Sequence, residues 1–108
     1  MTTHGRRFGT WISGAGMVLA AALTSGCGGA IYAFTANSAS SKLETAEALG
    51  AAKYAPYEYY TAREHLWKAR EEAAAADYGD AIDFADVAEE YADKAITLAK
   101  QAHEGAGR

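Results

Sequence analysis

The sequence predicts an all-α fold, either an antiparallel helical hairpin or a three-helix bundle. Alanine, the residue with the highest intrinsic helix propensity, occupies 23 positions of residues 27–108. Apolar residues in this part recur at alternating spacings of three and four, which is the period of one helix face. The 108 residues allow one small domain. Because alanine buries little apolar surface, we expect marginal stability or support from a partner chain.

The first predicted helix runs from about Ser38 to about Lys53. Ser41 precedes Glu44 by three residues, which is the spacing of a capping box at a helix start. Apolar residues follow at helical spacing, namely Leu43, Ala46 and Leu49. Gly50, a weak helix former, is expected to loosen the last turn.

Pro56 marks the start of the second predicted helix, which runs to about Ala76. Proline suits the first position of a helix, where its missing N–H would have no partner in any case. A heptad-like seam follows, consisting of Tyr59, Ala62, Leu66, Ala69, Ala73 and Ala76. These spacings of three and four are typical of helices that pack together as in a coiled coil.

The third predicted helix begins after Asp77, whose side chain suits a helix cap, and runs to about His103. It carries an uninterrupted alanine seam, consisting of Ala81, Ala85, Ala88, Ala92, Ala95, Ala99 and Ala102. Such a seam lets two helix axes approach to about 8 Å. The short turn before it predicts antiparallel pairing with the second helix. This hairpin resembles the local geometry of a tetratricopeptide repeat, although the chain has room for little more than one unit.

Residues 1–26 are predicted to be a targeting segment. Arg6 and Arg7 supply its positive start, and residues 11–23 form an uncharged apolar stretch. Plain secretion is one alternative. An uncleaved anchor helix from Trp11 to Phe34 is another, because that length suits a bilayer. Polar and glycine residues interrupt the middle of that run, which argues against the anchor helix.

The end of this segment resembles the lipobox of bacterial lipoproteins. Ser25, Gly26 and Cys27 match the last three positions of the motif, whereas Thr24 stands where leucine is commonest. The resemblance implies cleavage between Gly26 and Cys27. It also implies covalent diacylglyceryl and acyl groups, such as palmitate, on Cys27. Gly28 is not the aspartate that often retains such proteins at the inner membrane, so the resemblance favours the periplasmic face of the outer membrane.

The predicted organisation therefore has four parts. A lipoprotein signal peptide covers residues 1–26, and a lipidated N-terminus and linker cover residues 27–37. An α-helical domain covers residues 38–104, and a flexible tail that frays covers residues 105–108. Cys27 is the one cysteine of the sequence, which excludes an intramolecular disulfide and is explained by lipidation.

The charge of the chain argues against nucleic acid as a partner. The net charge is −4, and removal of residues 1–26 would take away two arginines and no acid, leaving −6. No basic patch is present to offset repulsion by phosphates. The same balance disfavours electrostatic docking on anionic lipid heads, so the membrane contact is predicted to be the lipid anchor.

Residues capable of catalysis or metal binding do not occur in the required patterns. His65 follows Glu64 without a second histidine four residues on, so a zinc site is not predicted. Acids recur every three residues at Asp77, Asp80, Asp83 and Asp86. This spacing drifts around a helix and predicts a solvated acidic face rather than a calcium loop. The sequence shows no nucleophile–histidine–acid set, phosphate loop or cofactor motif, so we predict no enzyme activity, no metal and no cofactor beyond the covalent lipid.

Aromatic residues gather at the start of the second predicted helix. A partner contact is predicted there, formed by Tyr54, Tyr57, Tyr60, Arg63 and Trp67. Exposed tyrosine, tryptophan and arginine are enriched in protein interfaces. The alternative is that some of the tyrosines pack on the third helix and the others line the end of the bundle. Arg63 and Trp67 lie one helical turn apart, so a stack between them is also possible.

The segment after the cysteine resembles an uncharacterised family of bacterial envelope lipoproteins. The resemblance covers about residues 27–103, and its distinctive residues are YAPYE at 54–58 and DYGDA at 77–81. The family has a short alanine-rich helical domain of unknown function, which sometimes stands beside an outer-membrane-protein-A-like, peptidoglycan-binding domain. The resemblance implies the fold and an envelope location, but no activity.

We therefore expect a lipid-anchored periplasmic scaffold or adaptor that contacts an envelope protein or associates with itself. One alternative is a lipoprotein that binds a cell-wall fragment, a lipid or a cation, and a cavity lined by tyrosines near Pro56 would favour it. Another is a structural coiled assembly that links membrane and wall.

Overall fold

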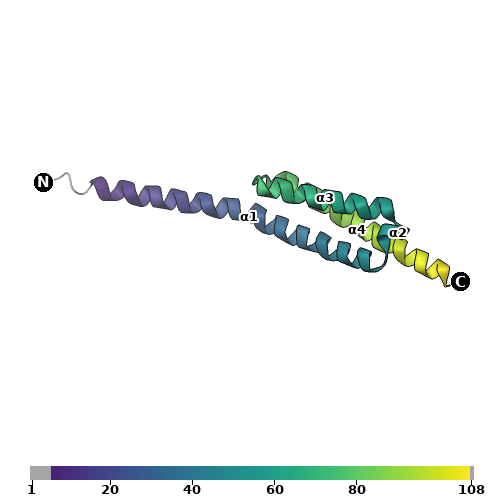
Figure 1. The fold of residues 1–108 in the computed structure, drawn as a ribbon. Helices are drawn as coiled ribbons and strands as arrows, with labels where there is room; N and C mark the ends of the chain where they lie inside the picture. Colours follow the sequence, from purple (N-terminus) through teal and green to yellow (C-terminus); the bar gives the residue numbers. More distant parts are fainter. Residues whose placement is uncertain (1–5, 108) are drawn as a thin grey trace.

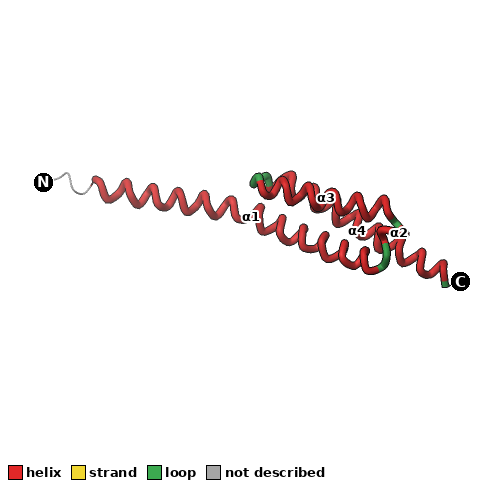
Figure 2. Tube along the Cα trace, viewed as in Figure 1, coloured by secondary structure: helices red, strands yellow, loops and turns green. Residues whose placement is uncertain are grey.

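The computed structural model describes the backbone of residues 6–107 and the side chains of residues 27–107. The first five residues of the predicted signal segment and Arg108 of the predicted tail lie outside the described residues. The described chain is helical with no strand, which confirms the predicted all-α class (Figure 2). Its four helices are α1 (Arg6–Ala48), α2 (Ala51–Tyr54), α3 (Pro56–Ala74) and α4 (Tyr78–Ala106) (Figure 1).

Helix α1 begins far upstream of the predicted start, so the expected helix start near Ser38 to Ser41 is wrong. Residues 27–37 contain no proline, and nothing in them stops the helix from continuing upstream. Ser41 therefore lies inside the helix, where its carbonyl oxygen accepts a 3.1 Å hydrogen bond from the Thr45 hydroxyl. The segment predicted as a linker is helical, while its role as a lipidated N-terminus stays a prediction.

Two backbone features turn the chain between α1 and α3. Gly50 has φ 75°, a left-handed conformation that glycine adopts without steric cost, and it ends the run that was expected to reach Lys53. The single-turn helix α2 follows it. Pro56 then begins α3 at its first position, as predicted.

The turn between α3 and α4 also follows local rules. Helix α3 ends at Ala74, two residues before the predicted end, because Ala76 takes a left-handed φ of 60°. The Asp77 side chain accepts a 3.3 Å hydrogen bond from the Asp80 backbone N–H, which confirms Asp77 as the cap of α4. Helix α4 extends to Ala106, three residues beyond the predicted end at about His103.

Helix α4 is the central element of the bundle. It packs along both α1 and α3, whereas α1 and α3 contact each other far less. Figure 1 shows the second half of α1, together with α3 and α4, side by side as a three-helix bundle, and the first half of α1 extending beyond it. The three-helix arrangement is therefore the form that the predicted all-α fold takes.

The core is an alanine seam on α4. Its buried members are Ala81, Ala85, Ala88, Ala92, Ala95 and Ala99, all at zero exposure. Around this seam the larger buried side chains are few, chiefly Leu43 of α1 with Tyr59 and Leu66 of α3. Because an alanine projects only a methyl group, two neighbouring helices can approach the same helix closely. The predicted seam is confirmed, except that Ala102 is half-buried.

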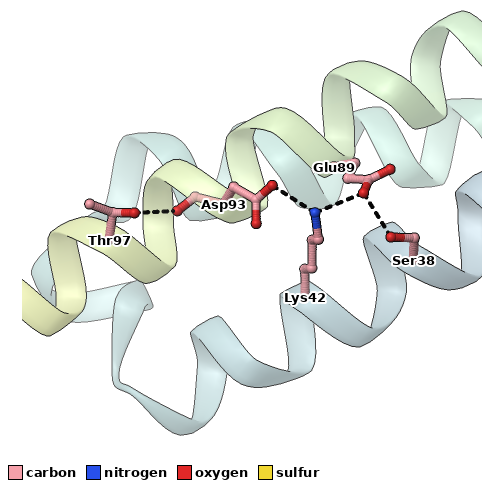
Figure 3. A network of polar contacts seen from close by, with 5 residues as sticks. All are labelled: Ser38, Lys42, Glu89, Asp93 and Thr97. Atoms are coloured by element: carbon pink, nitrogen blue, oxygen red, sulfur yellow. Dashed lines mark hydrogen bonds and ion pairs between the residues drawn. The ribbon is translucent and has the colours of Figure 1, made fainter.

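A polar network joins α1 to α4 beside the seam (Figure 3). The Lys42 ammonium donates 2.7 Å hydrogen bonds to Glu89 Oε1 and to Asp93 Oδ2. The Ser38 hydroxyl donates a third 2.7 Å bond to the same Glu89 oxygen. Hydrogen bonds from Lys42 and then from Ser38 lower the pKa of Glu89, and bonds to Asp93 and Glu89 raise the pKa of Lys42. The network fixes the register of α1 along α4.

Substitution of Ala92 by leucine should destabilise the bundle. Ala92 is fully buried in the seam, so the larger side chain would push α4 away from its neighbours, at a cost of about 3 kcal/mol. Urea unfolding followed by circular dichroism measures the change. Ala33→Leu, at an exposed position of α1, is the matched control and should change the free energy of unfolding little. Equal effects of the two substitutions would contradict the seam as the core.

The Glu89 network should make stability depend on pH in the acidic range. A carboxyl whose pKa is lower in the folded state adds stability above its unfolded pKa, and that stability is lost as the pH falls through the folded pKa. Glu89→Gln should therefore flatten the loss of stability below about pH 4.5, the ordinary value for glutamate. Unfolding curves from pH 7 to pH 3 test this, with the exposed Glu104→Gln as control. An unchanged pH profile in Glu89→Gln would exclude the network as its source.

Candidate protein-binding groove

A groove of about 690 Å³ runs between α1 and α3. It forms because both helices pack onto α4 while touching each other little. The residues that line it are Ser40, Leu43, Glu44, Glu47, Tyr59, Arg63, Glu64, Leu66, Trp67 and Arg70. We call this feature the α1/α3 groove.

The floor of the α1/α3 groove is apolar. Leu43 of α1 and the α3 residues Tyr59 and Leu66 lie there, each less than a tenth exposed. Trp67 also lines the groove but is 58% exposed, so most of its indole surface faces solvent. A large aromatic side chain left open beside a buried apolar floor can gain further burial when another surface docks.

The two walls of the groove carry opposite charges. The α1 wall contributes two acids, Glu44 and Glu47, and the α3 wall contributes Arg63 and Arg70 with one acid, Glu64. Among residues 27–107, Arg63 and Arg70 are the only arginines, so every arginine of the bundle lines this groove.

The charges of the groove do not pair with one another. In the part of the chain whose side chains are described, the ion pairs join Lys42, Lys68 and Lys94 to nearby acids, and none includes a groove residue. The Arg63 guanidinium lies over the Tyr60 ring, 6.0 Å from its centroid, rather than on Trp67. Lys42, Lys68 and Lys94 thus have acidic partners, whereas Arg63 and Arg70 of the groove take part in none of these ion pairs.

A second, smaller hollow of about 420 Å³ lies between α3 and α4. Its lining residues are Glu58, Glu90, Asp93, Lys94, Thr97 and Leu98. Lys94 is already engaged there, with its ammonium 2.7 Å from Glu90 Oε1 and 4.6 Å from the centroid of the Tyr91 ring. This hollow contains no tyrosine, whereas the α1/α3 groove contains Tyr59, so the small-ligand alternative stays a prediction.

The structure spreads the predicted contact patch over α2, which ends at Tyr54, and over α3. Tyr54 packs edge-on against His103, and Tyr57 packs edge-on against Tyr91 of α4. Tyr60 packs against Tyr59, while Arg63 and Trp67 line the α1/α3 groove. Tyr54, Tyr57, Tyr60 and Trp67 are all exposed, with Tyr57 at 67%. Their role in partner binding remains a prediction, and only Arg63 and Trp67 share the groove.

Sequence reasoning missed the acidic wall of the groove. Ser40, Glu44 and Glu47 are spaced by four and three residues, which places them on one face of α1. Arg63 and Arg70 are spaced by seven, which places them on one face of α3. These spacings were readable in the sequence. Which face of α1 meets which face of α3 depends on how both helices pack on α4. That packing could not be read from the sequence.

His65 and the acids at the turn before α4 make contacts within the bundle. His65 Nδ1 lies 2.8 Å from the Thr61 carbonyl oxygen, and its ring packs near Phe84 and Tyr91. Carboxylate oxygens of Glu72, Asp77 and Asp80 come within 4.8 Å of one another. They gather at the turn before α4, where acids near a helix N-terminus are favoured by its dipole.

Cys27 is exposed on α1, at the edge of the described side chains. Ile31 and Phe34, four and seven residues further on, continue the same face and are 55% and 79% exposed. The next residues already belong to the bundle, because a Cβ built on Gly28 would lie 3.1 Å from the Tyr78 Cβ. The predicted cleavage partner Gly26 lies where only the backbone is described. Among the described residues, no helix is long and apolar enough to cross a membrane.

Comparison with known proteins places the chain in a family. Residues 35–106 match the family described as "Domain of unknown function (DUF4398)", and the chain belongs to it. This confirms the predicted membership of an uncharacterised helical domain family. No curated protein and no solved structure matches the chain. The match begins at Thr35, inside α1 and close to where the bundle starts.

Proposed function

We propose that this protein is a lipid-anchored, non-catalytic scaffold or adaptor of the bacterial cell envelope that binds a protein through the α1/α3 groove. The observation that carries the proposal is the groove itself, with an apolar floor, an exposed tryptophan and walls of unpaired opposite charge. The covalent lipid would be diacylglyceryl and acyl groups on Cys27, with the periplasmic face of the outer membrane as its location.

The composition of the groove supports a protein as its ligand. Protein interfaces combine an apolar centre with a polar rim, and tryptophan, tyrosine and arginine dominate their binding energy. Tyr59, Arg63 and Trp67 supply these types at helical spacing along α3. A groove between two helices that lie side by side can also hold an amphipathic helix, which presents one apolar stripe flanked by charges.

The position of Cys27 supports the anchor. The exposed apolar residues Ile31 and Phe34 continue its face of α1, so apolar surface would lie beside the lipid. Contact between Gly28 and Tyr78 means that the bundle begins directly after the modified residue. Acyl chains would thus attach the bundle to the membrane without a flexible spacer.

The anchor predicts a change of location on Cys27→Ser. The parent chain should remain in the membrane fraction, and the variant should leave it, because one thioether-linked lipid group supplies the attachment. Intact-mass measurement of the membrane-extracted parent should show loss of residues 1–26 and gain of acyl groups. A parent that keeps residues 1–26 with an unmodified thiol would contradict the proposal.

The groove predicts contact with protein at Trp67. A photo-crosslinking amino acid at position 67 of the full chain should yield discrete protein adducts in intact cells. The same probe at Lys100, which is exposed on α4 outside both hollows, should yield few. Because arginine and tryptophan carry much of the binding energy of interfaces, Arg63→Ala should weaken the adduct at position 67. Absence of any adduct at position 67 would overturn the proposal.

A further inference from the structure

We infer that the α1/α3 groove binds a second copy of this chain, with the two copies parallel and related by a two-fold axis that runs along the groove. The inference rests on the proposed function, because it names the partner of the same groove. It is carried by the distribution of charge over the two walls and by the geometry of a symmetric contact.

The groove face is complementary to itself in charge. Glu44 and Glu47 lie on the α1 wall, and Arg63 and Arg70 lie on the α3 wall. A symmetric dimer uses the same surface patch on both copies, so each charge on one wall must meet a charge of opposite sign on a different wall of the other copy. The acids of the α1 wall and the two arginines of the α3 wall, where Glu64 is the one acid, provide this condition.

Only one orientation of the two-fold axis uses that complementarity. An axis parallel to the helices sets α1 of one copy over α3 of the other at the same height, so Glu44 and Glu47 face Arg63 of the second copy. An axis across the helices sets α1 over α1 and brings the glutamates of the two copies together. Like charges facing each other disfavour that arrangement. The charge pattern therefore selects parallel copies.

The net negative charge of the chain disfavours contacts between two copies outside the groove. A chain that begins at Cys27 would carry a net charge of −6, so two copies repel each other over most orientations. The groove is where both arginines of residues 27–107 gather, and neither is neutralised by an ion pair within the described side chains. Close contact through the groove thus places each arginine-bearing wall against an acidic wall of the other copy.

Burial of apolar surface would stabilise the dimer. The core consists largely of alanine, which buries little area per residue. Trp67, which is 58% exposed beside the buried floor, would become covered in the dimer. Parallel copies also bring both Cys27 residues to the same end, where two lipid anchors can enter one membrane.

Charge exchange between the walls tests the dimer. Full-length chains that carry two different tags are expressed together, extracted in mild detergent and purified through one tag. Parent copies should copurify. Arg63→Glu copies, or Glu44→Arg/Glu47→Arg copies, should copurify with their own kind at least about tenfold less, because each exchange sets like charges together. Lys100→Glu, an equal charge change outside the groove, should leave copurification unchanged.

The mixed combination distinguishes repulsion from misfolding. When Arg63→Glu copies are paired with Glu44→Arg/Glu47→Arg copies, every contact again joins an acid to a base. Copurification should then return toward the parent level. Recovery in the mixture requires both variants to be folded. Copurification of parent copies that is insensitive to both exchanges, or no recovery in the mixture, would overturn the inference.

Disulfide formation tests the orientation. Copies with Glu47→Cys mixed with copies with Arg63→Cys should crosslink under mild oxidation in the parallel dimer, whereas Glu47→Cys copies should crosslink with one another only if α1 lies over α1. The parent chain without either new cysteine is the control for Cys27. A dominant Glu47→Cys self-crosslink would overturn the parallel arrangement.

These outcomes separate the inference from the proposed function. If parent copies do not copurify while position 67 still crosslinks to a different protein, the self-association fails and the protein-binding groove stands. If neither copurification nor any adduct at position 67 is seen, both fail.

Discussion

The close contact made by the alanine seam of α4 determines most of this structure. Six fully buried methyl groups along one helix let α1 and α3 both settle on α4. A single helix that is approached closely from two sides keeps its two neighbours apart from each other. The α1/α3 groove is the consequence, since the third side of the triangle of helices is left open. The same small residues that build the core thus also leave the surface that we propose binds a partner.

The polar residues divide into two groups with different roles. Beside the seam, Lys42 bridges Glu89 and Asp93, and its hydrogen bonds, of which the one to Glu89 is partly buried, fix α1 against α4. Across the groove, the acids of α1 and the arginines of α3 face solvent without ion partners among the described side chains. Surface ion pairs contribute little to folding. The groove charges therefore have more influence on which molecule can dock than on the stability of the bundle.

Features set by local chemistry were predictable from the sequence. The alanine seam, the start of α3 at Pro56 and the Asp77 cap each depend on a few neighbouring residues, and all three are confirmed. The start of α1 was mispredicted because Ser41 and Glu44 have the spacing of a capping box, although nothing upstream interrupts the helix. The groove was only half predictable. Arg63 and Trp67 were predicted to be contact residues, but their position across the groove from Glu44 and Glu47 depends on tertiary packing.

The unbroken course of α1 has a consequence for distance from the membrane. A chain tethered by a flexible linker samples a range of heights, whereas a continuous helix sets one. From Cys27 to the groove residues Ser40 and Glu47, α1 rises roughly 20 to 30 Å at about 1.5 Å per residue. With a lipid on Cys27, the groove would lie within that fixed reach along the helix axis. A partner could bind the groove only if its own docking surface lay at the same distance from the membrane. The continuous helix would therefore select partners by their position in the envelope as well as by their chemistry.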